Sequence, residues 1–141
     1  MKKKILIFGL GSIGVKHANL LLKFKKISEI LFFSRRKNKK FNSTINIEEI
    51  VEFNPDYILV CSKTFQHFQD IKLIEKIFKN KIVLVEKPLF HKSIKLSLKK
   101  NKYYVGYNLR FHPVIKFLKN KLKKKEIFSV SILCNSFLPT W

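Results

Sequence analysis

The sequence has 141 residues, and a hydrophobic share of 46% supplies enough apolar surface for one packed domain or one domain and the start of another. Thirty basic residues stand against nine acidic ones, which gives a net charge of +21. This composition excludes a disordered chain, and no apolar run reaches the roughly 18 residues that a bilayer-spanning helix needs.

Apolar runs of strand length alternate with amphipathic segments of helix length, which is the pattern of repeated βα units around a parallel sheet. The predicted elements are, in order, strand 4–8, helix 12–24, strand 29–33, helix 47–53, strand 57–61, helix 65–78, strand 82–85, helix 93–99, strand 103–106, helix 113–122 and strand 127–133. We therefore predict an α/β fold in which residues 1–123 form a doubly wound, Rossmann-type parallel sheet. Its connecting segment is 107–123, and 124–141 begin a second α/β domain with one strand.

Three glycines follow the first predicted strand at the spacing Gly9-x-Gly11-x-x-Gly14 and lead into a helix that begins near Ser12 and Ile13. In dinucleotide-binding folds these glycines allow a tight turn, close approach of the backbone to the pyrophosphate, and close packing of helix on strand. The free N–H groups of the helix start bind phosphate. The alternative interpretation of 1–14 as a secretory signal fails, because glycines interrupt the apolar run and no small-residue cleavage site follows.

The residues after the second predicted strand bear on the choice of dinucleotide. NAD-binding chains carry an acidic residue there, which accepts hydrogen bonds from the adenosine ribose. This sequence has Ser34, Arg35 and Arg36 instead. A hydroxyl followed by cations suits a 2′-phosphate, so the sequence favours NADP over NAD, although some of this signal is the general lysine and arginine excess.

Glu86, Lys87 and Pro88 follow the fourth predicted strand, at the end where parallel strands deliver side chains to a ligand. A lysine beside a carboxylate can polarise or deprotonate a substrate hydroxyl while hydride leaves the carbon. In a chain this rich in lysine, the spacing alone favours an ordinary surface lysine.

Four motifs in order resemble the Gfo/Idh/MocA oxidoreductases, the relatives of glucose–fructose oxidoreductase and inositol dehydrogenase. The motifs are Gly9-Leu10-Gly11-Ser12-Ile13-Gly14, Cys61-Ser62-Lys63-Thr64-Phe65-Gln66-His67, Glu86-Lys87-Pro88, and Val105-Gly106-Tyr107-Asn108-Leu109-Arg110-Phe111-His112-Pro113. The resemblance extends over essentially the whole chain. It implies an N-terminal Rossmann domain that binds NAD or NADP, and hydride transfer to or from sugars, cyclitols, nucleotide sugars and related alcohols or ketones.

The resemblance also implies roles for individual residues. Lys87 is the implied catalytic residue beside nicotinamide and substrate, with Glu86 alongside the cofactor. Ser62 and Lys63 replace a threonine–proline pair of the family, and this departure leaves the rigidity of the loop open. Thr64 follows that pair, and His67 matches a histidine of the same cofactor loop. Arg110 lies on the implied substrate side, or it is a structural salt-bridge donor.

Relatives of this family are longer, and their second domain supplies an aspartate and a histidine of the active site and often the dimer interface. Residues 135–141 resemble the opening of that domain. We therefore expect the chain to be an incomplete oxidoreductase that retains nucleotide binding, with a small sugar-like substrate and a homo-oligomer typical of the family.

Two other functions stay open from the sequence. One is a non-catalytic dinucleotide-binding module. The other is a nucleic-acid-binding protein, disfavoured because the lysines are spread along the chain and only Arg35, Arg36 and Arg110 are arginines, the residue preferred for bidentate phosphate contacts. Cys61 and Cys134 fit no metal-ligand spacing and are typical of thiols in a reducing compartment, so we expect a cytoplasmic protein without metal, specific nucleic acid or membrane.

Overall fold

The computed structural model describes residues 2–133, which form two compact units divided between Tyr107 and Asn108. Each unit is described by itself. Among the described residues no helix combines the length and the apolar character that crossing a membrane requires.

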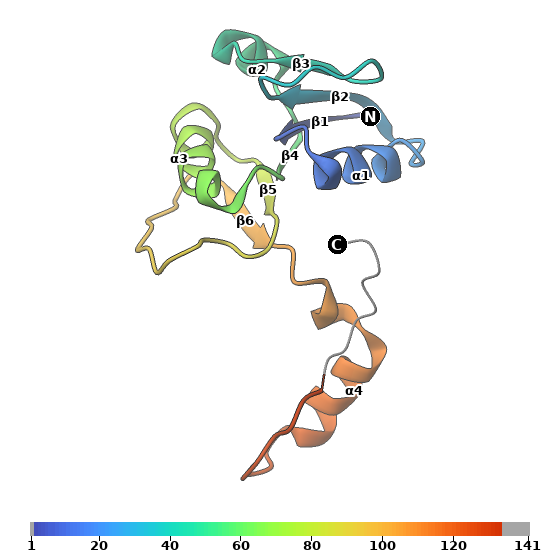
Figure 1. The fold of residues 1–141 in the computed structure, drawn as a ribbon, viewed down its shortest axis with the longest axis vertical. Coiled ribbons are helices and arrows are strands. Elements are labelled where there is room, and N and C mark those ends of the chain that lie inside the picture. Colours follow the sequence, from blue (N-terminus) through green and yellow to red (C-terminus); the bar gives the residue numbers. More distant parts are fainter. Residues whose placement is uncertain (1, 134–141) are drawn as a thin grey trace. The chain divides into compact units, whose positions relative to one another are not determined.

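The first unit is built on one sheet of six parallel strands. The strands are β1 (Lys3–Phe8), β2 (Ile27–Phe33), β3 (Asn42–Thr44), β4 (Tyr57–Val60), β5 (Ile82–Val85) and β6 (Lys102–Val105). Their spatial order is β3-β2-β1-β4-β5-β6, and every neighbouring pair is parallel (Figure 1). The strands β2 and β3 follow on one side of β1, and β4, β5 and β6 follow on its other side, so the order reverses between β1 and β4. Ligands bind in the crevice at such a switch point, beyond the carboxyl ends of the strands. The predicted α/β Rossmann-type fold is confirmed.

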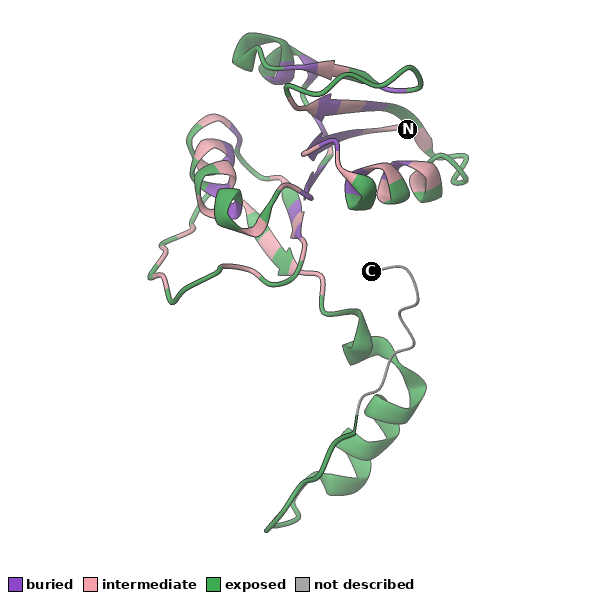
Figure 2. Cartoon of the chain, in the orientation of Figure 1, coloured by how far each residue is buried: buried purple, intermediate pink, exposed green. Residues whose placement is uncertain are grey.

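Helices cover both faces of this sheet and explain the apolar runs of its central strands. Helix α1 (Ser12–Leu21) packs over one core cluster, whereas α2 (Ile47–Phe53) and α3 (His67–Ile77) pack over another, with a 3-10 turn (Thr64–Gln66) before α3. Ile5, Leu6, Ile7 and Phe8 of β1 are each at most 1% exposed. A strand covered on both faces has no polar side to alternate with, which is why β1 is apolar from Ile5 to Phe8, the part that is buried (Figure 2).

Two elements of the first unit differ from the prediction. The helix predicted over 93–99 is wrong, because this segment is extended. Its apolar residues recur every second position, and Leu96 and Leu98 pack against the core cluster of α3 while the residues between them are exposed. That period of two belongs to an extended chain rather than to a helix. The three-residue strand β3 was not predicted, because Asn42–Thr44 carries no apolar run.

The end of the long segment between β5 and β6 is hydrogen-bonded to one side chain of α3. The carboxylate of Glu75 accepts hydrogen bonds from the backbone N–H groups of Lys99 and Lys100, from the Asn101 amide and from the Tyr103 hydroxyl, at 2.6–3.0 Å. These four contacts replace the regular secondary structure that the segment lacks.

The second unit contains a 3-10 turn (Asn108–Phe111) and helix α4 (Pro113–Leu122), whose bounds were predicted from the sequence. The helix begins with Pro113 after His112, whose Nδ1 accepts the Val114 N–H at 3.3 Å. The strand predicted over 127–133 is not formed by the described residues, and its apolar side chains are exposed. A strand requires a hydrogen-bonded neighbour, and this segment pairs with none among residues 2–133. Cys134 and the predicted domain start over 135–141 lie outside the described residues.

Candidate functional site

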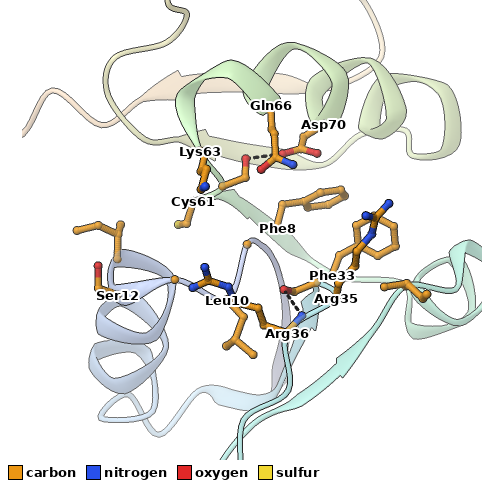
Figure 3. Close-up of a pocket in the computed structure, with 16 residues that line it drawn as sticks. Phe8, Leu10, Ser12, Phe33, Arg35, Arg36, Cys61, Lys63, Gln66 and Asp70 are labelled. Carbon is orange, nitrogen blue, oxygen red and sulfur yellow. Dashed lines mark hydrogen bonds between the residues drawn. The ribbon is translucent and has the colours of Figure 1, made fainter.

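A cavity of about 740 Å³ opens at the carboxyl edge of the sheet, beyond the ends of β1, β2 and β4 (Figure 3). It is lined by the last residues of β1 and β2, by the segments that follow β1, β2, β3 and β4, and by the first turns of α1 and α3. The lining residues are Phe8, Gly9, Leu10, Gly11, Ser12, Ile13, Phe33, Ser34, Arg35, Arg36, Ile45, Cys61, Ser62, Lys63, Gln66 and Asp70. This is the place at which an open parallel sheet binds its ligand.

The turn after β1 depends on two glycines for its geometry. Gly9 has φ +94°, and a Cβ added to it would lie 2.6 Å from the Cα of Ser62. A Cβ on Gly14 would overlap the carbonyl oxygen of Gly9. A Cβ on Gly11 would meet no atom within 4 Å, so the protein itself does not require glycine there. The space in front of Gly11 therefore remains open for a ligand.

The start of α1 supplies unpaired backbone donors to this space. Gly11 is the N-cap and offers no side chain to the helix, and the first intrahelical bond is from Val15 N–H to the Gly11 carbonyl at 3.0 Å. The N–H groups of Ser12, Ile13 and Gly14 thus have no partner in the helix. Together with the positive end of the helix dipole, they make an anion site of the kind that binds phosphate.

The loop after β2 places two cations at the cavity. The Ser34 Oγ accepts the Arg36 N–H at 3.1 Å, and the Arg36 carbonyl accepts the Ser43 hydroxyl at 2.9 Å. Ser34 N–H donates to the Thr44 carbonyl at 2.9 Å. These bonds hold the loop in shape while the side chains of Arg35 and Arg36 stay exposed. The Ser34 hydroxyl proton remains free to donate to a ligand.

The opposite wall carries an acidic residue that the sequence interpretation missed. Asp70 lies one turn after Gln66 on α3, and its carboxylate accepts the Ser62 hydroxyl at 2.5 Å. Burial raises the pKa of Asp70 despite the Ser62 hydrogen bond and the nearby His67, both of which lower it. The signal that would have found it is the four-residue spacing of Gln66 and Asp70, which places both on one helix face behind the strand end.

His67 has a different place from the one expected. Its ring is 1% exposed and does not line the cavity. Nδ1 lies 3.1 Å from the Leu89 carbonyl oxygen and Nε2 lies 3.1 Å from the Ser62 carbonyl oxygen. No ring surface is left for a ligand, so the predicted cofactor contact of His67 is corrected to a positioning contact, which holds the Ser62 loop to the segment after Lys87.

Glu86 and Lys87 lie at the same edge of the sheet but do not line the cavity. They follow β5, two strands away from β1, which is roughly 10 Å at the usual strand spacing. The Glu86 carboxylate contacts His17 Nε2 of α1 at 2.7 Å and accepts the Lys87 N–H at 3.2 Å. The Lys87 side chain is exposed. His17, which sequence reasoning missed, follows Gly14 by three residues and so lies on the same side of α1.

The remaining candidate residues are not part of the cavity surface or are unreactive there. Thr64 lies half-buried in the 3-10 turn and does not line the cavity. Cys61 does line it, but burial and the nearby Glu86 raise the pKa of its thiol to about 12, which removes it as a nucleophile. Arg110 is an exposed residue of the second unit, and its substrate-side role stays a prediction. Within residues 2–133 no three His, Cys, Asp or Glu side chains are grouped to hold a metal ion.

Comparison with known proteins agrees with this geometry. Residues 3–100 match the model of an oxidoreductase family, GFO_IDH_MocA, described by its NAD-binding Rossmann fold. A solved dehydrogenase from Clostridium difficile is 29% identical, with a TM-score of 0.65 over 85% of this chain and 44% of that one. None of the curated proteins gives a significant match.

Two further solved structures share the fold at lower identity. A scyllo-inositol dehydrogenase from Lactobacillus casei, solved with bound NAD(H) and scyllo-inositol, is 21% identical with a TM-score of 0.64, over 89% of this chain and 43% of that one. A UDP-N-acetylglucosamine 3-dehydrogenase from Acidithiobacillus ferrooxidans is 14% identical with a TM-score of 0.61, over 86% and 43%. The chain therefore spans less than half the length of each of these three solved relatives.

Proposed function

The chain belongs to the Gfo/Idh/MocA family of oxidoreductases, and from this premise we propose that its cavity binds a nicotinamide dinucleotide for hydride transfer to or from the alcohol or ketone of a sugar or cyclitol. The observation that carries the proposal is the start of α1. Its unpaired N–H groups face a cavity that Gly9 and Gly11 leave open, which matches the pyrophosphate of a dinucleotide.

The residues of the chain divide into a binding set and a reacting residue. Ser12, Ile13 and the glycine turn bind the pyrophosphate, and Ser34 with Arg35 binds the adenosine ribose end. Bound dinucleotide supplies the hydride acceptor or donor. Lys87 holds the substrate hydroxyl and takes its proton at Nζ as the alcohol is oxidised, and it returns the proton in the reverse direction.

The proposed substrate class comes from the relatives. Three of the solved structures are named as a scyllo-inositol dehydrogenase, a myo-inositol 2-dehydrogenase and a UDP-N-acetylglucosamine 3-dehydrogenase. All three substrates are polyhydroxylated rings with a secondary alcohol, so we infer a substrate of that chemistry for the whole protein. Arg110 on the substrate side, a cytoplasmic location and assembly into a homo-oligomer belong to the same proposal.

The cationic loop after β2 leads us to propose NADP as the preferred dinucleotide. NADPH is expected to bind at least roughly tenfold more tightly than NADH, because each charge-assisted hydrogen bond to the 2′-phosphate is worth about 1.5–3 kcal/mol. Arg35→Ala and Arg36→Ala are expected to reduce NADPH affinity and to change NADH affinity much less. Calorimetric titration of the two dinucleotides measures both effects. Lys39→Ala, which removes an exposed cation outside the cavity lining, is the matched control. Tighter binding of NADH than of NADPH would reverse the assignment.

Substitution of Lys87 distinguishes a catalytic chain from one that only binds the dinucleotide. Lys87→Ala is expected to lower turnover by about 10²–10⁴-fold, the usual contribution of a positioned acid or base, without changing dinucleotide affinity. The assay is NAD(P)H formation over a panel of inositols, sugars and nucleotide sugars. Lys92→Ala removes an exposed lysine of the same segment and is expected to retain full turnover. If neither the original chain nor Lys87→Ala turns over while both bind dinucleotide, the second candidate, a non-catalytic dinucleotide-binding module, is favoured instead.

A further inference from the structure

The cavity has an apolar floor at some distance from the phosphate-binding helix start. The half-buried ring of Phe33 lines this part of the cavity. It packs on the ring of Phe8, which is 1% exposed and belongs to the core beneath, with centroids 5.0 Å apart and planes inclined at 52°. Figure 3 shows them beyond the glycine turn as seen from Ser12. Ile45, 65% exposed, lines the same cavity. Such a floor suits a flat heteroaromatic ring, which packs its apolar face on aromatic and aliphatic side chains.

Asp70 and Gln66 stand on one wall above this floor, and Arg35 and Arg36 stand on the other (Figure 3). The Asp70 Oδ2 accepts the Ser62 hydroxyl. The other carboxylate oxygen, Oδ1, has no hydrogen-bond partner within residues 2–133. An ionised carboxylate accepts hydrogen bonds and donates none, so this oxygen is available to accept a hydrogen bond from a ligand donor.

We propose that Asp70 Oδ1 accepts a hydrogen bond from the 6-amino group of the purine base, so that this carboxylate selects adenine dinucleotides against their 6-oxo counterparts. The inference rests on the proposed dinucleotide binding and adds to it a residue that determines which base is accepted. The edge of adenine presents an amino donor at this position, whereas hypoxanthine presents an acceptor oxygen. An oxygen facing the carboxylate leaves both groups without a donor, and a site built for a hydrogen bond rejects the analogue that lacks it.

The other parts of a dinucleotide fit Asp70 less well. Phosphate oxygens carry negative charge and are repelled by a carboxylate, and the helix start of α1 and the Arg35 loop lie at other parts of the cavity. Burial raises the pKa of Asp70, since its ionised form lacks water, and a ligand N–H compensates for that missing water. A ribose hydroxyl is the other available donor, and the test below distinguishes it from the base.

Asp70→Asn tests the proposal because it keeps the size of the side chain and puts a hydrogen-bond donor where the carboxylate had an acceptor. The oxygen of the new amide replaces the acceptor for Ser62, and its NH₂ group becomes a donor toward the base. The chain with Asp70 is expected to bind NADH at least tenfold more tightly than reduced nicotinamide hypoxanthine dinucleotide, the value of one charge-assisted hydrogen bond. In Asp70→Asn this ratio is expected to fall below one. Calorimetric titration with the two dinucleotides measures it.

Glu49→Gln provides the matched control, because it removes one negative charge from the exposed face of α2, outside the cavity lining. Its binding ratio is expected to equal that of the original chain. Asp70→Asn is also expected to melt at a higher temperature at pH 7. The pKa of Asp70 is higher in the folded chain than in the unfolded chain, so its ionisation lowers the free energy of unfolding once pH exceeds the ordinary aspartate range. The amide of asparagine does not ionise and removes this cost. The melting curve shows that the variant is folded.

The outcomes separate this inference from the proposed function. An unchanged ratio in Asp70→Asn overturns the role of Asp70 in base selection. An equal loss of affinity for both dinucleotides also overturns it, and indicates that the carboxylate faces the ribose. Equal binding of both dinucleotides to the original chain overturns base selection while leaving dinucleotide binding intact. If the folded original chain binds neither dinucleotide, both the proposed function and this inference fail.

Discussion

Gly9→Ala is expected to lower the free energy of unfolding by about 3–5 kcal/mol, which is most of the stability of a small domain. The backbone at Gly9 has φ +94°, a conformation that side chains rarely adopt. The new Cβ would also lie 2.6 and 2.7 Å from the Cα and N of Ser62, and 2.9 Å from the carbonyl carbon of Cys61. These are backbone atoms of the next strand end, and they cannot rotate away. Urea denaturation followed by circular dichroism measures the change.

Gly11→Ala is the matched control for that substitution, and it separates folding from binding. Its Cβ would meet nothing within 4 Å, so the free energy of unfolding is expected to stay within about 1 kcal/mol of the original. The methyl group would nevertheless occupy the space that the pyrophosphate needs, and dinucleotide affinity is expected to fall by at least roughly tenfold, a cost of about 1.4 kcal/mol. A stable Gly11→Ala chain with full affinity would show that the pyrophosphate does not approach here.

Glu75→Ala is the second large expected loss, about 2–4 kcal/mol in the free energy of unfolding. Four donors would lose their shared acceptor, namely the N–H groups of Lys99 and Lys100, the Asn101 amide and the Tyr103 hydroxyl. Loss of a hydrogen bond to a charged group costs about 1.5–3 kcal/mol. Water can hydrogen-bond to some of the four donors at this half-buried site, which reduces the total loss. The segment between Lys87 and β6 would lose its hydrogen bonds to Glu75 of α3 and keep its apolar packing and the His67 contact. Equilibrium urea denaturation of the two chains measures the loss.

The same carboxylate predicts a dependence on pH. Burial raises the pKa of Glu75, but the backbone hydrogen bonds of Lys100 and Lys99, with those of Asn101 and Tyr103, outweigh it and hold the pKa below the ordinary 4.5. A lowered folded-state pKa stabilises the fold above the unfolded pKa, and this contribution disappears as pH falls through the folded value. The stability difference from Glu75→Gln is therefore expected to be full at pH 7 and to shrink below about pH 4.5. A difference that stays constant down to about pH 3 would contradict an ionised Glu75.

The strands and the phosphate-binding turn were predictable because their signals are local. Four consecutive buried residues, Ile5 to Phe8, make an apolar run in β1, and the glycine motif Gly9-x-Gly11-x-x-Gly14 lies within one βα unit of the sequence. Helix α2 ends at Asn54, in a left-handed conformation before Pro55, and the residue before a proline is known to leave helical geometry. In such places neighbouring residues decide the structure, and a single sequence contains them.

The missed features depend on residues far apart in the chain. Segment 93–99 was predicted as a helix, but its conformation is decided by α3, against which Leu96 and Leu98 pack. His67 is 22 residues from Leu89, and no local pattern shows that the two meet. Asp70 lines the cavity because α3 packs beside the end of β1, and this packing is not visible in the local sequence. The sequence therefore predicted the glycine turn that lines the cavity, whereas the place of Asp70 in the cavity came from the structure.

The contact between His17 and Glu86 joins the two ends of the proposed reaction. His17 lies on α1, whose first turn we propose to bind the phosphates, and Glu86 precedes Lys87 directly. This contact thus joins α1 to the end of β5 that precedes Lys87. A dinucleotide that enters such a preorganised site gives up less free energy to arrange it, and its nicotinamide end is delivered to one place along the sheet edge.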